Sequence, residues 1–262
     1  MSSAIVTLTT DFGMRDPFVG VMKGVILQIA PTVRLVDLTH DIASHDVLEA
    51  AITLEAAAPF FPPGTIHLAV VDPGVGSTRR PLAAAAAGQL FVGPDNGLFT
   101  FLFRAAAWSA VALEAPAYRL PTVSQTFHGR DIFAPAAAHL AVGVPLHRFG
   151  PPLSDPVVIP WPTARREGDR LAGEVIHADR FGNLVTSLRL TDLEALGPAA
   201  ALVVEVEEKE VGRIVPCYAD LPPGGVGALI GSSGRLEISV REGSAQAVMG
   251  ARRGAAVRVR KG

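Results

Sequence analysis

Residues 5–30 read IVTLTTDFGMRDPFVGVMKGVILQIA, and this stretch decides the fold class. It begins with six residues rich in β-branched side chains, which favour a strand. After the turn at DFGMRD, apolar side chains recur at the spacing of one helix face, at Val19, Met22, Ile26 and Ile29. A strand followed directly by an amphipathic helix predicts a crossover unit in which the helix joins two parallel strands.

The same alternation continues to about residue 150. Strand-like runs VRLVDLT (33–39) and TIHLAVVD (65–72) enclose the helical pattern DVLEAAITLEAAA (46–58). We therefore predict an α/β fold, with an N-terminal α/β domain of mostly parallel sheet over residues 1–150.

The second half of the chain has a different pattern. Five prolines lie between Pro151 and Pro162, and neither a helix nor a central strand accepts such a run, so residues 151–168 are predicted to be a Pro-rich linker. Beyond it come short strands separated by Gly and Pro turns, such as LAGEVIHAD (171–179) and ALVVEVEE (201–208). This spacing predicts an antiparallel β-barrel-like C-terminal domain over residues 169–262.

Composition excludes several classes of protein. Of the 262 residues, 49% are hydrophobic and 18% charged, which argues against disorder. The net charge of -2 comes without any run of like charges, so no nucleic-acid partner is expected. No apolar stretch approaches the ~20 residues of a membrane span, and no leader pattern is present, so we expect a cytoplasmic protein without a membrane partner. The single cysteine, Cys217, excludes an internal disulfide.

Ionisable side chains follow the predicted strands, where ligands of open α/β sheets gather. Asp11 follows the first strand, Asp72 begins DPGVGSTRR, and His128 lies in TFHGRDIFAP before a predicted helix. Each alone is compatible with a turn or capping role. DPGVGSTRR also lacks the Gly-Lys-Ser/Thr ending of a nucleotide-binding P-loop, so triphosphate chemistry has little support.

The segment THDIASHDV (39–47) allows two interpretations. Its histidines, His40 and His45, could join Asp11 in a metal-dependent hydrolase. The simpler interpretation is a loop in which Ser44 caps the next helix, because no further His or Cys completes a standard ligand pattern. We predict no metal site.

Two turns of the C-terminal half combine polar and aromatic side chains. HADRFGNLVTS (177–187) is compatible with a hairpin, but Asp179, Phe181 and Asn183 could also recognise an ammonium group, a ring and a purine edge. In IGSSGRLE (230–237), Ser232 and Ser233 offer hydroxyls between glycines that free backbone N–H groups for an anion.

Five ordered motifs span nearly the whole chain: TLTTDFGMRDPFVGVMKGVI (7–26), VVDPGVGSTRRP (70–81), GPDNGLF (93–99), TFHGRDIFAPAAAHLA (126–141) and DRFGNLVTS (179–187). Together they resemble the S-adenosyl-L-methionine (SAM) hydroxide adenosyltransferases, or SAM hydrolases, which are relatives of the fluorinases and chlorinases. The resemblance implies a two-domain subunit, a homotrimer with the substrate between neighbouring subunits, and no cofactor. It also implies the reaction: water displaces L-methionine at the ribose C5′ and leaves adenosine.

The resemblance also assigns residues. It places the water-activating group on Asp72, Arg79 and His128, with Arg79 preferred to its neighbour Arg80, and leaves open whether Asp72 or His128 is the base. Asp11 matches the carboxylate that grips the ribose diol. The remaining expected substrate contacts are Asp16 beside the ribose, Phe127 as an apolar wall, Gly129, Asp179 for the methionine ammonium, Phe181 and Asn183 for adenine, and Ser232 with Ser233 for the methionine end.

Two alternatives remain open beside hydrolysis. One is transfer of the adenosyl group to chloride, because Gly129 matches the glycine that chlorinases have at this position. An anionic Asp72, however, would repel a halide. A SAM- or nucleoside-binding module without turnover is the other alternative.

Overall fold

The computed structural model describes residues 3–104 and 107–262 and divides the chain into two compact units, Met1–Pro160 and Trp161–Gly262. The division falls within the predicted linker. The first part of that segment packs on unit 1, because the backbone N–H of Val157 donates to Asp95 Oδ1 (2.7 Å) and that of Ile159 donates to Thr100 Oγ1 (3.0 Å). The prolines there end regular structure without freeing the chain from the unit.

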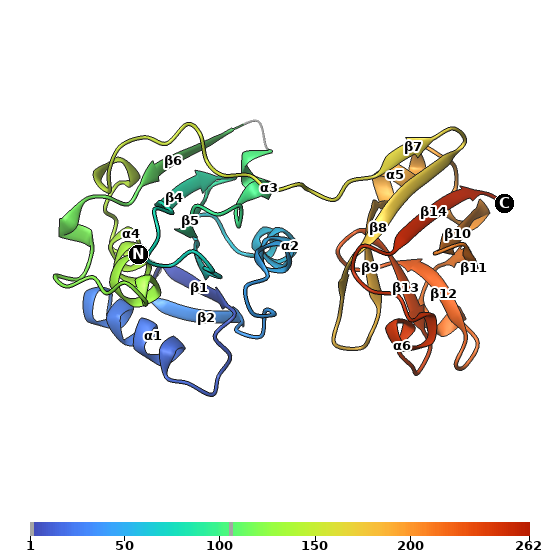
Figure 1. Ribbon diagram of the computed structural model, residues 1–262, viewed down its shortest axis with the longest axis horizontal. Coiled ribbons are helices and arrows are strands. Elements are labelled where there is room, and N and C mark those ends of the chain that lie inside the picture. The colour runs from blue at the N-terminus through green and yellow to red at the C-terminus, as the bar shows by residue number, and fades with distance from the viewer. Residues whose placement is uncertain (1–2, 105–106) are drawn as a thin grey trace. The chain divides into compact units, whose positions relative to one another are not determined.

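Unit 1 contains a six-stranded sheet of order β2-β1-β3-β5-β4-β6 (Figure 1). The pairings of β1 with β2, β1 with β3, and β3 with β5 are parallel, and β4 pairs antiparallel with both β5 and β6. The prediction of a mostly parallel sheet is therefore confirmed. The strands are β1 (Ile5–Thr10), β2 (Arg34–Thr39), β3 (Ile66–Val70), β4 (Pro81–Ala86), β5 (Gln89–Pro94) and β6 (Trp108–Ala112).

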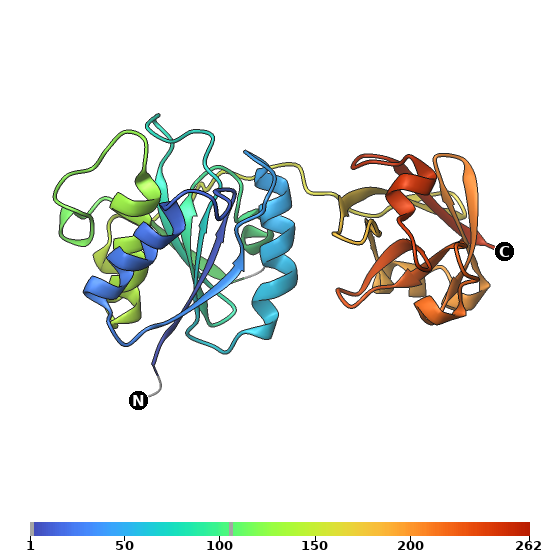
Figure 2. The same cartoon turned by 90° about the horizontal axis from the view of Figure 1, so that it is seen from below.

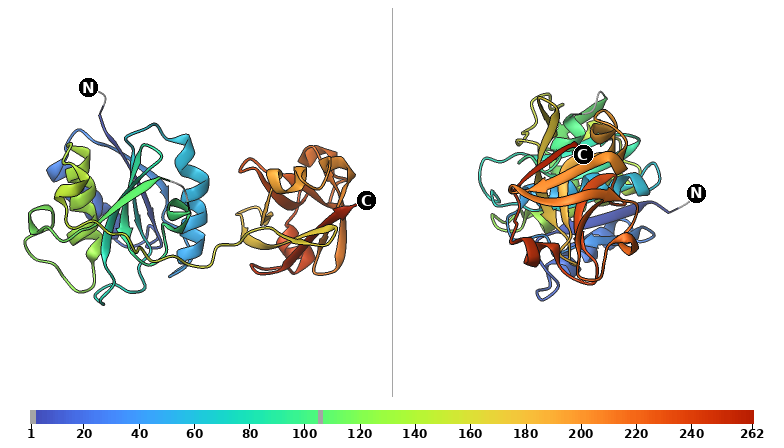
Figure 3. Two further views of the ribbon diagram at one scale, coloured as in Figure 1. Left: turned by 90° about the horizontal axis from the view of Figure 1, so that it is seen from above. Right: turned by 90° about the vertical axis from the view of Figure 1, so that its right-hand side faces the viewer.

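Helices cover both faces of this sheet, which makes a three-layer unit. Figures 2 and 3 show α1 and α4 on one face and α2 on the other. The helix predicted from residues 17–30 is α1, and it buries Val19, Met22 and Ile26 as its spacing requires. The helices are α1 (Phe18–Ile29), α2 (Val47–Ala57), α3 (Thr100–Phe103) and α4 (Ala134–Ala141), the last preceded by a π-helical segment, Gly129–Phe133.

Unit 2 is a closed barrel. Its strands follow the order β14-β10-β11-β12-β13-β9-β8, and an antiparallel pairing of β14 with β8 closes the ring, while the short β7 extends from β8. All pairings are antiparallel except that of β11 with β12. The elements are β7 (Arg165–Glu167), β8 (Arg170–Ala178), β9 (Leu184–Arg189), α5 (Leu190–Glu194), β10 (Leu202–Val206), β11 (Lys209–Val215), β12 (Val226–Ile230), β13 (Arg235–Val240), α6 (Ala245–Met249) and β14 (Ala256–Lys261).

The topology of unit 1 decides where its polar loops meet. Strands β1 and β3 are parallel neighbours, and Thr10 at the end of β1 is paired with Val70 at the end of β3. Asp11 and Asp72 follow these two strand ends, so both emerge at the same edge of the sheet. None of the helices in the described residues is long and apolar enough to cross a bilayer.

Candidate active site

A cavity of about 310 Å³ lies at this edge of the unit 1 sheet. It brings together residues from four separate loops. Of the expected site residues it contains Asp11, Asp72, Phe127, His128 and Gly129. The full lining is Asp11, Phe12, Phe18, Ser44, His45, Val70, Asp72, Val75, Thr126, Phe127, His128 and Gly129.

Arg79 lies behind the cavity wall and connects two of the lining residues. Its guanidinium forms a bidentate pair with Asp72, from Nε to Oδ1 (3.1 Å) and from Nη2 to Oδ2. Nη2 also lies 3.0 Å from His128 Nδ1. The side chains of Asp72 and Arg79 are only 5% and 6% exposed, so this pair is a rigid, desolvated unit.

The contact with Arg79 defines the state of His128. Burial, followed by the nearby Arg79 cation, lowers the pKa of His128 below its ordinary value, so the imidazole is neutral at pH 7. Arginine can only donate, so Nδ1 of His128 is the acceptor and the ring proton resides on Nε2. His128 therefore offers an N–H, while Asp72 offers carboxylate oxygens.

Asp11 is held on the other side of the cavity. Its Oδ2 accepts the backbone N–H of His45 at 2.9 Å, and the His45 imidazole Nδ1 lies 4.0 Å away. His45 adopts a left-handed backbone with φ of 67°, which is uncommon for a residue with a side chain. Asp16, expected beside Asp11, is exposed and does not line the cavity.

Three phenylalanines form an apolar wall. Phe12, Phe18 and Phe127 meet in edge-to-face contacts with ring centroids 5.2–6.0 Å apart. Gly129 lies beside them, and a Cβ there would stand 3.1 Å from Met22 Sδ and 3.2 Å from the Phe127 ring. The glycine thus allows Phe127 and the helix carrying Met22 to approach closely.

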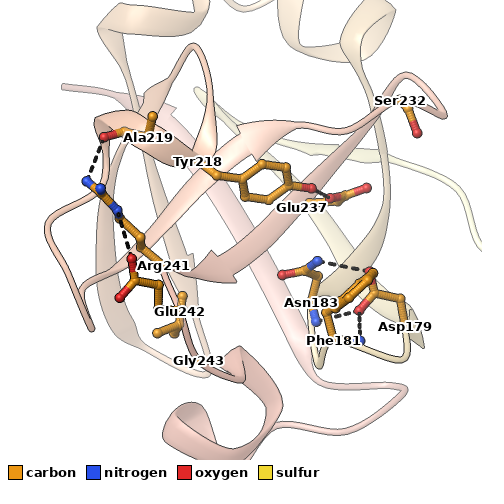
Figure 4. A pocket seen from close by; sticks show the side chains of 11 residues that line it. Asp179, Phe181, Asn183, Tyr218, Ala219, Ser232, Glu237, Arg241, Glu242 and Gly243 are labelled. Atoms are coloured by element: carbon orange, nitrogen blue, oxygen red, sulfur yellow. Dashed lines mark hydrogen bonds and ion pairs between the residues drawn. The ribbon is translucent and has the colours of Figure 1, made fainter.

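A second, larger cavity of about 720 Å³ lies in unit 2 (Figure 4). It collects Asp179, Phe181 and Asn183 from the turn between β8 and β9, and Ser232 from the turn after β12. Ser233 is exposed and lies outside the lining. The other lining residues are Tyr218, Ala219, Glu237, Val240, Arg241, Glu242 and Gly243.

The turn between β8 and β9 is both a hairpin and part of the cavity. Asp179 Oδ1 accepts the backbone N–H of Phe181 (2.9 Å) and of Asn183 (2.8 Å), and Oδ2 accepts Asn183 Nδ2 (2.9 Å). Gly182 takes the left-handed conformation that the turn requires, with φ of 81°. Uncharged donors therefore fix the carboxylate of Asp179.

The opposite wall of this cavity holds a phenol and a carboxyl group. Tyr218 Oη donates to Glu237 Oε2 at 2.9 Å (Figure 4). Burial raises the pKa of Tyr218 to about 12, with Glu237 adding to the effect, so the phenol keeps its proton. Burial also raises the pKa of Glu237, and the charge of Asp179 adds to it.

The comparisons with known proteins agree in naming one family. Residues 6–150 match the model of the SAM hydroxide adenosyltransferase N-terminal domain, and residues 173–258 match that of its C-terminal domain. The chain belongs to this family.

The similar proteins include SAM hydrolases and fluorinases. The (R)-S-adenosyl-L-methionine hydrolase of Thermus thermophilus is 42% identical, over 95% of this chain and 97% of the relative. A fluorinase of Nocardia brasiliensis is 30% identical over 74% of each chain. The crystal structure of an uncharacterized conserved protein from Thermotoga maritima superimposes with a TM-score of 0.92 at 34% identity, covering 98% of this chain and 100% of that chain.

Several lining residues were absent from the sequence-based set. Phe12 and Phe18 lie in the first quoted motif, and their position after β1 was the available signal. His45, considered from the sequence only as a metal ligand, follows β2 and lines the cavity. Glu237 lies in the quoted IGSSGRLE stretch, but in a pattern typical of an ordinary barrel strand. Tyr218, in a 3₁₀ turn, and Arg241, just after β13, lie in no quoted motif. The pairing of β13 with β9 places Glu237 beside the strand that follows the Asp179 turn, and Tyr218 hydrogen-bonds Glu237 there.

The side chains proposed for a metal-dependent hydrolase do not converge on a common point in the part of the chain that the structure describes. Both ring nitrogens of His40 face other groups, Nδ1 towards Thr10 Oγ1 (2.8 Å) and Nε2 towards Asp37 Oδ1 (3.0 Å). Within residues 3–104 and 107–262, no three His, Cys, Asp or Glu side chains form a cluster able to hold a metal ion. The expectation that Ser44 caps the following helix is wrong: Asp46 does so, accepting the backbone N–H of Glu49 at 3.0 Å.

Proposed function

We propose that this protein hydrolyses S-adenosyl-L-methionine to adenosine and L-methionine, by attack of water at the ribose C5′. The observation that carries the proposal is the Asp72–Arg79–His128 group beside the same cavity as Asp11. A carboxylate, a neutral imidazole and a second carboxylate for a diol match the needs of a bound nucleoside and an attacking water. The match to the family's domain model and the whole-chain relatives named SAM hydrolases support this substrate.

The states of the two polar groups suggest their roles. A water placed between Asp72 and His128 would donate one proton to the carboxylate and accept the Nε2–H of the imidazole. Its oxygen attacks C5′, the C5′–S bond breaks, and the electron pair stays on the methionine sulfur, which becomes a neutral thioether. The proton passes to Asp72 and then to solvent. Arg79 keeps the carboxylate in position, and in this scheme Asp72 is the base.

The apolar wall supports the same step. The sulfonium loses its positive charge as the C–S bond breaks, so removing water from the site disfavours the charged substrate more than the transition state. Phe12, Phe18 and Phe127 supply apolar surface on the side of the cavity next to Gly129. In unit 2, Asp179 would accept the methionine ammonium, and Phe181 with Asn183 would face adenine.

The test is turnover in H₂¹⁸O. Purified protein should convert SAM to adenosine and methionine, with ¹⁸O at the adenosine 5′ oxygen, and the rate should persist in chelator-treated buffer because no cofactor is proposed. Unchanged SAM with correctly folded protein would refute hydrolysis and leave a binding module. Loss of activity with chelator would instead restore a metal-dependent reaction.

Chloride transfer is the second candidate, and Gly129 is the observation in its favour. A carboxylate at Asp72, held as an anion by Arg79, opposes it by repelling a halide. Formation of 5′-chloro-5′-deoxyadenosine at molar chloride would favour this candidate, and adenosine as the sole product would exclude it.

We also propose that the protein forms a homotrimer with its substrate sites at the subunit interfaces. Its proposed location is the cytoplasm. Exposed apolar side chains beside the unit 1 cavity, Met14, Phe18 and Val21, support an interface there. Light scattering coupled to size-exclusion chromatography measures the mass, and a monomer active at nanomolar concentration would refute the trimer. Cell fractionation would test the location.

A further inference from the structure

His40, the first of the two histidines in the THDIASHDV segment, is part of a chain of short polar contacts that the reaction scheme does not use. His40 is 5% exposed. Its Nδ1 lies 2.8 Å from Thr10 Oγ1, and its Nε2 lies 3.0 Å from Asp37 Oδ1. Asp37 Oδ2 in turn accepts from Lys23 Nζ at 2.6 Å. The chain thus connects α1, the end of β2 and the end of β1.

The anchor of this chain is ionised. Burial alone would raise the pKa of Asp37, but the hydrogen bond from Lys23 and the contact with His40 together lower it below its ordinary value. A fixed carboxylate therefore holds the Nε2 side of the imidazole. This leaves Nδ1 directed at the hydroxyl of Thr10.

The other end of the chain reaches both sides of Asp11. Thr10 directly precedes Asp11, and its Oγ1 also accepts the backbone N–H of Phe12 at 3.2 Å. The backbone carbonyl of His40 accepts the N–H of Gly13 at 2.8 Å. Five residues further on, His45 donates its N–H to the Asp11 carboxylate. His40 thus contacts the Asp11 loop by side chain and by backbone.

We propose that His40 is a positioning residue that holds Asp11 in the orientation needed to bind the two ribose hydroxyls. The inference rests on the proposed function, in which Asp11 grips the diol. Loss of the Nδ1 contact releases the Thr10 hydroxyl, which also accepts the N–H of Phe12, so the loop that carries Asp11 can shift. A carboxylate oxygen that moves by about 1 Å no longer accepts both hydroxyls in good geometry.

Unit 1 contains a matched control for this contact. His67, on β3, places its Nδ1 2.8 Å from the hydroxyl of Thr7, which lies three residues earlier on the same strand as Thr10. His67 is fully buried, against Phe61 and Phe91, and does not line the cavity. The two Thr–His pairs therefore share strand, distance and burial, and differ in their proximity to Asp11.

The experiment is calorimetric binding of adenosine and of 2′,3′-dideoxyadenosine, which lacks the diol, to the intact protein. Wild type should prefer adenosine by about tenfold or more, as expected for hydroxyls bound to a charged acceptor. His40→Gln, whose amide reaches the Nε2 position but not the Nδ1 position, should remove most of that preference while dideoxyadenosine binds within about twofold of wild type. His40→Asn, whose amide reaches the Nδ1 position, should restore part of it.

Controls separate positioning from general destabilisation. His67→Gln should keep the full diol preference. If His40→Gln does not fold, Thr10→Val removes the same contact from the other side, and Thr7→Val is its matched control. Equal weakening of both nucleosides by His40→Gln, or no weakening of either, overturns the inference. If wild type lacks the preference, the diol role of Asp11 fails together with the inference; if Asp11→Asn removes the preference and His40→Gln keeps it, the inference alone fails.

Discussion

Asp72 in the unit 1 cavity and Asp179 in the unit 2 cavity are held by opposite means. In unit 1, Asp72 is paired with the Arg79 cation, which also contacts His128. In unit 2, the contacts that orient Asp179 come from backbone N–H groups and an amide. An ion pair fixes both orientation and charge state, which suits a group that handles protons, whereas uncharged donors orient a carboxylate without neutralising it, which suits recognition of a cation. The contrast predicts that changes at Asp72 affect turnover and that changes at Asp179 affect binding.

The largest effect is expected at Asp72. Asp72→Asn keeps the shape of the side chain but removes the proton acceptor, so kcat should fall by about 10²–10⁴-fold with KM within about threefold. Adenosine formation measured by chromatography gives both constants. Asp95→Asn is the matched control, because Asp95 pairs with Arg80 in the same unit and lies outside the cavity. If Asp72→Asn changed only KM, Asp72 would act in substrate binding, and the contrast with Asp179 would be wrong.

Acid should affect the two units in opposite directions. Burial lowers the pKa of His67 to about 4 from 6.5, so the unfolded chain binds the proton more readily, and unit 1 loses about 3 kcal/mol as pH falls from 6.5 to about 4. Burial raises the pKa of Glu237, so its contribution to unit 2 is present below pH 4.5 and disappears as pH rises through the folded pKa.

Hydrogen exchange followed by mass spectrometry reads the two units separately. We expect faster exchange in unit 1 at pH 5 than at pH 7, after correction for intrinsic rates, and a smaller difference in His67→Gln. A parallel loss of protection in both units would contradict the assigned directions.

Asp179→Asn should change binding by an intermediate amount. The substitution removes the charge that would bind the methionine ammonium, and hydrogen bonds to charged groups contribute about 1.5–3 kcal/mol, so KM for SAM should rise at least about tenfold with kcat within about threefold. The exposed Asp169, in the turn between β7 and β8, is the control for a surface charge in the same unit. A kcat effect equal to that of Asp72→Asn would show that both cavities act in the chemical step.

The smallest effect is expected at the phenol of the unit 2 cavity. Tyr218→Phe leaves Glu237 Oε2 without its donor, at a cost of about 1 kcal/mol, so KM should rise about fivefold. Glu237→Gln keeps an oxygen that accepts from Tyr218, and its KM should stay within about twofold of wild type. Initial-rate kinetics measure both variants, and a larger effect of Glu237→Gln would indicate that its charge, rather than its contact with Tyr218, matters.

Parts of the site followed from local sequence because strand ends are recognisable. Asp11 and Asp72 each follow a β-branched run, and parallel neighbours have their carboxyl ends at one edge, so their meeting was predictable. The exclusion of Asp16 from the cavity was not, because a side chain five residues away in a turn can point either way. The proline run likewise predicted the end of regular structure, but not the hydrogen bond that attaches Val157 to Asp95.

The sequence by itself determined the types of element, the division into an α/β part and a β part, and the motifs that indicate a SAM hydroxide adenosyltransferase, because periodicity, turn residues and motifs are local properties. Only the folded chain shows that His40 contacts Thr10 and that Tyr218 and Glu237 share a cavity with Asp179. It also places Arg79, the arginine that the resemblance favoured, against Asp72 and His128. The His40–Thr10 contact joins residues 30 positions apart and the Tyr218–Glu237 contact joins residues 19 apart, and the pairing and register of the strands set these distances.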